Sequence, residues 1–309
     1  MNRCHTLLTL VLAFSMASCT VNAGGFTVPD WLLKSVVFLM LGDRPVGTGF
    51  LLGLAENGCN YCYLVTAKHV AEAVLSDPKT ALAIRVNVKS TKQAQVLTFP
   101  TFDFHGKRWS EHPRPSTDLA IFPLAIYSVL QKLDVGMRVI KGADDEFLAT
   151  SPWLSRFKVR PGDRAFTLGL IPYLYRADKE NLVLSRFGSV SLLPDFEVDL
   201  PGGMQRVYFV DCPAYGGNSG GPALALLERN EKGEMIIGWR LALLGVVSAF
   251  VPSDLRMDVV GTESAERRQA IRLLENTGIA KIVPADAIAD VLYSNEQKEF
   301  RKRFAQKPK

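Results

Sequence analysis

Short apolar segments separated by turn-forming residues recur along this chain. They are rich in β-branched and aromatic residues, which is typical of β-strands. The predicted strands of a first series are Ser35–Leu41, Gly49–Leu54, Tyr63–Thr66, Leu82–Val88, Gln95–Phe99 and Leu119–Pro123. Those of a second series are Arg164–Leu168, Gly188–Leu192, Gln205–Val210, Pro222–Leu226, Met235–Leu244 and Gly245–Phe250. Turns such as Glu56-Asn57-Gly58 stand between them.

Helical patterns are scarce until the C-terminal part of the chain. Ala265–Leu274 and Ala285–Leu292 are the two candidates, and Pro284 precedes the second. The polar, irregular stretch 136–162 separates the two strand series. Many short strands at this spacing predict an all-β protein built from barrels or sandwiches.

The first residues have the features of a secretory signal. Arg3 supplies positive charge, Leu7–Phe14 is a short apolar core, and small residues follow. The core is too short to span a membrane, so we predict that residues 1–23 are a signal peptide and that the protein is exported.

Two cleavage sites compete within this segment. Met16-Ala17-Ser18-Cys19 resembles a bacterial lipobox, with Met where Leu is usual, and would leave Cys19 as a lipidated, membrane-attached N-terminus. Val21-Asn22-Ala23 fits ordinary signal peptidase and would give a soluble periplasmic or secreted protein.

Length and charge narrow the functional classes. The chain has 309 residues, of which 48% are hydrophobic, enough for one large domain or two small ones. The formal net charge is +5, and residues 298–309 alone account for this excess. The remainder is balanced, so nucleic-acid binding is not supported. We expect the tail to be a solvated, frayed C-terminus rather than a contact for an anionic surface.

The chain has five cysteines, and Cys4 and Cys19 fall in the signal segment. Cys59 and Cys62 form a C-x-x-C pair in residues that read as a strand, without the helix start or second ligand pair of a redox or zinc site. A local disulfide or two reduced thiols is favoured, and a disulfide would require a turn between them. Cys212 is left over, and we expect it to be buried.

Gly217-Asn218-Ser219-Gly220-Gly221-Pro222 is the most informative motif. Gly217 can adopt backbone angles closed to other residues, so its N–H can point the same way as that of Ser219. Two such donors about 3 Å from one point would stabilise the oxyanion of acyl transfer. Ser219 is therefore the candidate nucleophile, and Gly217 and Ser219 form the candidate oxyanion hole.

His69 is the candidate general base. It stands in Thr66-Ala67-Lys68-His69-Val70, where a strand ends and a short helix begins. His5 falls in the signal, while His105 and His112 lie in a polar loop. A histidine viewed alone is more often a packed or surface residue, but a serine nucleophile needs such a base.

Asp118 is the candidate acid because it opens the apolar strand Leu119–Pro123, where a carboxylate can be buried against an imidazole. Asp103, Asp134, Asp144 and Asp145 lie in more polar surroundings. The carboxylate would hold the imidazole tautomer and stabilise the imidazolium. This chemistry requires neither a cofactor nor a metal, and we predict none.

The order His69, Asp118, Ser219, together with the motifs around them, resembles that of trypsin-like serine peptidases. Weaker matches, among them Gly188-Ser189-Val190-Ser191 and Gly245-Val246-Val247-Ser248, make the chain look most similar to the bacterial Deg (high-temperature-requirement) branch. The resemblance covers about residues 35–290.

The resemblance implies two six-stranded antiparallel β-barrels with the site in the cleft between them. The implied organisation is a first barrel over 26–140, a linker over 141–162, a second barrel over 163–283, and a C-terminal helix and basic tail over 284–309. The first barrel would supply the base and the acid, and the second the nucleophile. A peptide substrate would add as a strand along Val247, Ser248 and Ala249, near a small or apolar pocket at Phe250 and Val251.

Several positions depart from the family pattern. Pro213, six residues before Ser219, is not an acid, so a preference for Lys or Arg is not supported. About 90 residues follow Ser219, which leaves no room for an appended peptide-binding (PDZ) domain. The predicted function is an exported serine endopeptidase that acts on proteins or peptides. The alternative is a catalytically silent peptide-binding protein on the same scaffold.

Asn218 leads to a prediction about activation. Trypsin-type zymogens have Asp at this position, where it pairs with a newly cut N-terminal amine, and no Ile-Val-Gly-Gly start follows the signal here. We therefore expect activity without propeptide cleavage, measured by comparing the mature protein with samples trimmed near the N-terminus. A strict requirement for such a cut would refute this expectation.

Overall fold

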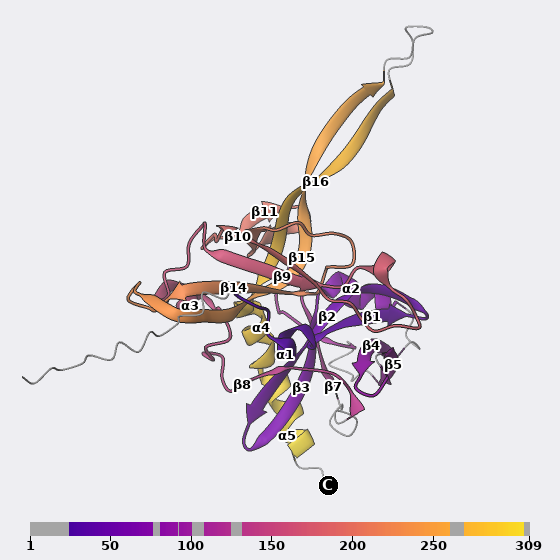
Figure 1. The fold of residues 1–309 in the computed structure, drawn as a ribbon, viewed down its shortest axis with the longest axis vertical. Coiled ribbons are helices and arrows are strands. Elements are labelled where there is room, and N and C mark those ends of the chain that lie inside the picture. Colours follow the sequence, from indigo (N-terminus) through magenta and orange to yellow (C-terminus); the bar gives the residue numbers. More distant parts are fainter. Residues whose placement is uncertain are drawn as a thin grey trace, which may run out of the picture.

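The computed structural model describes residues 25–76, 81–91, 93–100, 108–124, 132–259 and 269–305; the side chains of 254–259, 269–274, 304 and 305 lie outside this description. The chain is mainly β-strand, with few helices, and forms two β units (Figure 1). The predicted all-β class and the chymotrypsin-like arrangement of two β units are confirmed. The second unit is the predicted six-stranded barrel, whereas the first has eight strands, including one parallel pair, where six antiparallel strands were expected. Within the described residues, no helix is long and apolar enough to cross a membrane.

The N-terminal unit is an eight-stranded sheet. Its strands follow the order β5-β4-β1-β2-β3-β7-β6, with β8 parallel to β2. Their bounds are β1 Val36–Leu41, β2 Arg44–Glu56, β3 Cys59–Thr66, β4 Leu82–Val88, β5 Gln93–Phe99, β6 Ser110–Glu111, β7 Ala120–Leu124 and β8 Arg138–Ile140. The predicted turn at Asn57-Gly58 joins β2 to β3, and both residues have the positive φ that a tight hairpin requires.

The C-terminal unit is a closed six-stranded barrel in the order β10-β13-β16-β15-β14-β9. Its strands are β9 Arg164–Gly169, β10 Leu184–Leu192, β13 Tyr208–Asp211, β14 Pro222–Arg229, β15 Met235–Val259 and β16 Gln269–Pro284. A small hairpin, β11 Val198–Leu200 and β12 Gly203–Gln205, lies beside it. The helices are α1 Asp30–Leu33, α2 Lys68–Val74, α3 Ser151–Arg156, α4 Ala285–Leu292 and α5 Asn295–Ala305, with a 3₁₀ turn at Pro172–Leu174.

One apolar cluster joins the two units. It includes Phe38 and Phe50 from the sheet, Phe166 and Leu224 from the barrel, and Ile288 from α4, all nearly excluded from solvent. Each unit has a further core of its own. The two units are therefore packed against each other rather than linked as independent domains.

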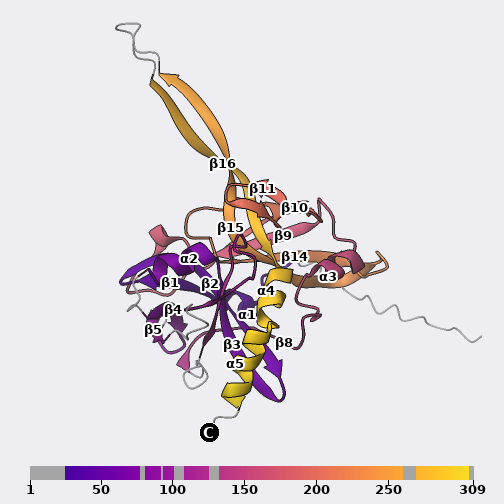
Figure 2. The same cartoon turned by 180° about the vertical axis from the view of Figure 1, so that it is seen from behind.

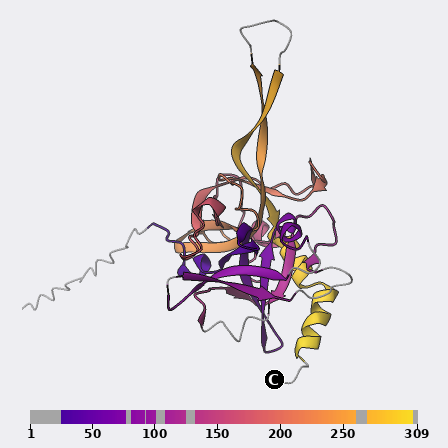
Figure 3. The same ribbon diagram turned by 90° about the vertical axis from the view of Figure 1, so that its right-hand side faces the viewer.

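The predicted helix Ala265–Leu274 is wrong from Gln269 onward, and its first residues lie outside the description. Residues 269–284 instead form β16, which pairs with β15 in an antiparallel ladder from Gly245↔Pro284 to Val259↔Gln269, with two register shifts between Val247 and Pro252. The two predicted strands that meet at Gly245 are one strand, β15. β15 and β16 extend beyond the barrel as a projecting two-stranded arm (Figure 3).

The C-terminal segment also differs from the prediction of a frayed tail. The predicted helix Ala285–Leu292 is confirmed as α4, and a second helix, α5, follows it along the molecule (Figure 2). Arg301 on α5 is only 1% exposed and donates from Nε to Glu56 Oε2 at 2.5 Å and from Nη1 to Leu292 O at 2.7 Å. A buried guanidinium without partners would be costly, so this ion pair fixes α5 on the β2–β3 hairpin.

Candidate active site

His69 is held where β3 gives way to α2. Val70, Ala71 and Val74 form the buried face of this short helix, which leaves His69 on the opposite, accessible side. α2 packs closely on β2, since a Cβ added at Gly47 would come within 2.6 Å of Val70 Cγ1. The histidine is therefore anchored through its neighbours.

Asp118 is brought to His69 by strand register. β7 pairs with β3 so that Ala120 lies opposite Thr66, which places residues 118 and 68 at neighbouring positions just beyond the ladder. Asp118 Oδ1 accepts from the backbone N–H of His69 at 3.0 Å, and Oδ2 lies 2.9 Å from His69 Nδ1. An ionised carboxylate only accepts hydrogen bonds, so Nδ1 carries the proton and Nε2 is left as the basic nitrogen.

Burial raises the pKa of the Asp118 carboxyl, but hydrogen bonds from His69 and Ser248, with the charge of His69, outweigh burial and hold its pKa below the ordinary value. The Ser248 hydroxyl donates to Asp118 Oδ2 at 2.5 Å. The carboxylate is thereby kept ionised and fully hydrogen-bonded beside the imidazole.

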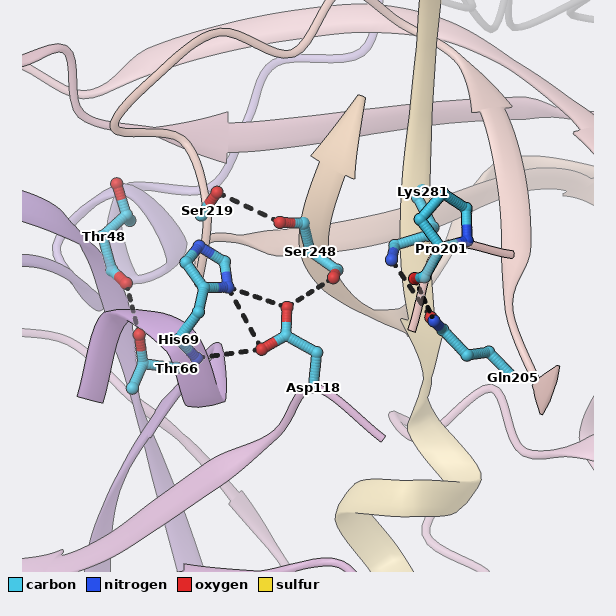
Figure 4. A network of polar contacts seen from close by, with 9 residues as sticks. All are labelled: Thr48, Thr66, His69, Asp118, Pro201, Gln205, Ser219, Ser248 and Lys281. Carbon is cyan, nitrogen blue, oxygen red and sulfur yellow. Dashed lines mark hydrogen bonds and ion pairs between the residues drawn. The ribbon is translucent and has the colours of Figure 1, made fainter. Parts of the chain in front are cut away.

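Ser219 lies in the loop between β13 and β14. Its Oγ donates to the backbone carbonyl of Ser248 at 3.1 Å, so that Ser248 contacts both the nucleophile and the acid (Figure 4). Within the described residues, the hydroxyl makes no hydrogen bond to His69. The hydroxyl proton must turn away from Ser248 O before it can be directed to Nε2.

The predicted oxyanion donors lie in this loop. Gly217 has φ +95°, and a Cβ there would come within 2.2 Å of Pro172 Cδ, so only glycine fits. In the part of the chain that the structure describes, the amide N–H groups of Gly217 and Ser219 donate to no other protein group. Both donors are thus available to an incoming oxygen.

Asn218 shapes the same loop and is only 4% exposed. Its Oδ1 accepts from the Tyr215 N–H at 3.0 Å, and its Nδ2 donates to Leu170 O at 3.4 Å. A neutral amide suffices for these contacts, because it both accepts and donates.

Thr48 and Thr66 are site residues that sequence reasoning missed. Thr48 donates from its backbone N–H to Ser219 O at 3.0 Å and from Oγ1 to Gly217 O at 2.6 Å. Thr66 Oγ1 in turn donates to Thr48 O at 2.7 Å. The only sequence signal is the small, polar Gly47-Thr48-Gly49 within an otherwise apolar strand.

A cavity of about 370 Å³ opens beside these residues. Its lining includes His69, Asp118 and Ser219, four of the five predicted substrate-binding residues (Val247, Ser248, Ala249, Phe250) and Lys281, which the sequence analysis did not single out. Pro213, the fifth, is exposed and lies outside the lining, because its neighbours Cys212 and Ala214 are buried in the barrel core on either side. β14 pairs with β15 as far as Val246, and the Ser219 loop continues this contact to Val247, which accepts from Gly220 N–H at 2.7 Å and donates to Gly221 O at 2.9 Å. Within the described residues, no backbone–backbone hydrogen bond is made on this side of β15 beyond Val247.

The remaining candidates lie away from this cavity. His112 contacts Asp290 on α4, with Nε2 and Oδ2 3.2 Å apart, and His105, Asp103 and Cys19 fall outside the described residues. Cys59 and Cys62 are free thiols on the straight strand β3, and burial raises the pKa of Cys62 to about 12. Cys212 is buried, as predicted. Among the described residues, no group of three or more His, Cys, Asp or Glu is placed to hold a metal.

No protein-family model matches the chain, and neither does any curated protein. Among solved structures, it is similar to the MamO protease domain from Magnetospirillum magneticum in its apo form, at 17% identity over 85% of this chain and 98% of that one, with a TM-score of 0.44. It is also similar to Rv3671c from M. tuberculosis H37Rv, a serine-to-alanine mutant in an inactive form, at 15% identity over 90% of each chain, with a TM-score of 0.41. An inactive form of the Rv3671c protease gives 15% identity over 84% of this chain and 88% of that one, with a TM-score of 0.41. Similarity at this level says nothing about the activity of this chain. Its function is therefore argued from its own residues.

The environment of Asp118 generates a prediction for acid stability. Folding lowers the pKa of Asp118. At a pH above its unfolded pKa of about 3.9, ionised Asp118 therefore stabilises the folded state. This contribution is lost as the pH falls through the pKa that Asp118 has in the folded state. We expect Asp118→Asn to lower the free energy of urea unfolding at pH 6, and the gap from wild type to narrow below about pH 4. Exposed Asp195→Asn is the control and should show no such pH dependence. A difference in the free energy of unfolding between wild type and Asp118→Asn that is constant from pH 2 to 7 would contradict a lowered pKa for Asp118.

Proposed function

We propose that this protein is a serine endopeptidase that hydrolyses peptide bonds through an acyl-enzyme. The observation that carries the proposal is the convergence of His69, Asp118 and Ser219, from the two β units, on one cavity, with His69 Nδ1 2.9 Å from Asp118 Oδ2. The triad, the free amide donors of Gly217 and Ser219 and the unpaired edge of β15 supply the parts that acyl transfer to a peptide needs.

In the proposed mechanism, Ser219 Oγ rotates from Ser248 O toward His69 Nε2, loses its proton to that nitrogen and attacks the scissile carbonyl. Asp118 holds the Nδ1–H tautomer and stabilises the imidazolium as it forms. The amides of Gly217 and Ser219 receive the oxyanion. His69 then protonates the leaving amine. In the second half of the cycle, His69 takes a proton from water as the water attacks the acyl-enzyme, and returns that proton to Ser219 Oγ as the carboxylic acid product leaves.

A catalytically silent peptide-binding protein is the second candidate. It is favoured by one observation, the hydrogen bond of Ser219 Oγ to Ser248 O rather than to His69. On this view, the β15 edge binds peptides that are not cleaved.

A fluorophosphonate probe separates the two candidates. We expect wild-type protein to be labelled covalently, Ser219→Ala to lose all labelling, and His69→Ala to slow it by at least about thousandfold, since the triad acts as a unit. Ser155→Ala is the matched control, an exposed serine on α3. Labelling that is absent, or that persists in Ser219→Ala, would rule out the catalytic proposal.

Export is part of the proposal, supported by the N-terminal sequence alone. Residues 1–24 lie outside the described part of the chain. Mass spectrometry of the mature protein from a bacterial host should show either a lipidated N-terminal Cys19 or an N-terminal Gly24. An intact Met1 in the mature protein would refute the proposal of export.

A further inference from the structure

Lys281 is a charged residue in an apolar strand. It interrupts the run Ile279-Ala280-Lys281-Ile282-Val283 on β16. Ala280 and Ile282 are fully buried in the barrel core, so strand alternation puts Lys281 on the other face. There it lines the same cavity as the candidate triad.

The Lys281 ammonium is held by a neutral partner. Nζ donates to Gln205 Oε1 at 3.1 Å, and Gln205, which is 6% exposed, donates from Nε2 to Pro201 O at 3.0 Å (Figure 4). These bonds orient the ammonium but bring no negative charge into contact with it. An ammonium has three N–H donors, so this contact uses only one of them.

No carboxylate within the described residues forms an ion pair with Lys281. Burial lowers its pKa, and the charge of Asp118 opposes that effect. The two oxygens of Asp118 are already occupied by His69 and Ser248. A half-buried cation with a neutral partner is costly unless an anion joins it.

The rest of the cavity suits an incoming side chain. Ala214, Val247, Ala249 and Phe250 give it small or apolar walls. Ala249 is the register partner of Lys281 on β15, and within the described residues the β14-side edge of that strand makes no backbone–backbone hydrogen bond beyond Val247. Ser219 and Lys281 line the same cavity, so a peptide side chain that enters it beside Ser219 shares that cavity with the ammonium.

We propose that Lys281 selects substrates that carry an acidic side chain, Asp or Glu, close to the bond that Ser219 attacks. The inference rests on the proposed function and names its substrate class. The ammonium would form a charge-assisted hydrogen bond with the carboxylate and would repel a basic side chain at the same place.

The test measures binding on the full-length Ser219→Ala variant, so that no turnover is required. The probes are N-acetylated, C-amidated alanine hexapeptides that carry one Glu or one Gln at successive positions. We expect Glu to bind about ten- to a hundredfold more tightly than Gln at one position. Adding Lys281→Met should abolish this preference and Lys281→Arg should retain it, while Lys232→Met, in the exposed β14–β15 turn, is the matched control.

Equal binding of Glu and Gln at every position, or a preference that survives Lys281→Met, would overturn the inference. The same peptides with free C-termini test the other source of a carboxylate, and a preference that follows the C-terminus would overturn the side-chain assignment. Unchanged thermal unfolding of Lys281→Arg ensures that at least one variant reports on a folded protein.

The failure of this inference and that of the peptidase proposal are distinguishable. Ser219-dependent labelling without a Glu preference would support the peptidase proposal and refute the proposed role of Lys281 in substrate selection. A Lys281-dependent Glu preference without labelling would refute the peptidase proposal and would support a binding site for acidic peptides. In an active enzyme, kcat/KM should follow the same Glu-to-Gln ratio as the binding, which a purely electrostatic effect of Lys281 on Asp118 would not produce.

Discussion

Thr48 connects the two β units at the point where the candidate chemistry needs them in register. Its backbone N–H and its hydroxyl donate to Ser219 O and Gly217 O, and its Oγ1 also accepts from Leu170 N–H at 3.0 Å. The candidate base and acid come from one unit and the candidate nucleophile from the other, so their separation depends on this contact. Gly220 permits the approach, since a Cβ there would lie 2.0 Å from Thr48 O. A displacement of about 1 Å at such a junction is enough to impair catalysis.

Ser248 and Lys281 show how the barrel contributes beyond the nucleophile. Ser248 accepts from Ser219 through its carbonyl and donates to Asp118 through its hydroxyl. One residue of β15 therefore contacts both ends of the candidate triad. Lys281, on the neighbouring strand, adds a positive charge to a cavity in which Asp118 supplies the negative one. The cleft therefore has opposite charges in fixed places, both held by hydrogen bonds to neighbouring side chains.

The features that sequence reasoning located are local ones. The Asn57-Gly58 turn and the helix after Pro284 follow from nearby residues, and short motifs identified the three residues of the candidate triad, which line one cavity. The errors concern long-range partners. Apolar spacing in 269–274 fits a helix or a strand, and pairing with β15 decides for the strand. From the sequence alone, Arg301 is one of several basic residues in a predicted solvated tail. Its buried position depends on the ion pair with Glu56, which lies 245 positions away in the sequence. Lys281 was visible as a charge in an apolar run, but its meaning depends on which face of β16 it occupies.

The route of the chain also constrains when the protein can acquire its structure during synthesis. β16 closes the barrel between β13 and β15, and α5 then returns to the β2–β3 hairpin. The N-terminal sheet has all its strands by Ile140, but the barrel stays open until β16 has been made, although its other strands emerge earlier. Unpaired strand edges are prone to aggregation while they wait. Closure of the barrel by β16 is thus a late event, and until it occurs the edges of β13 and β15 are open to pairing with another chain.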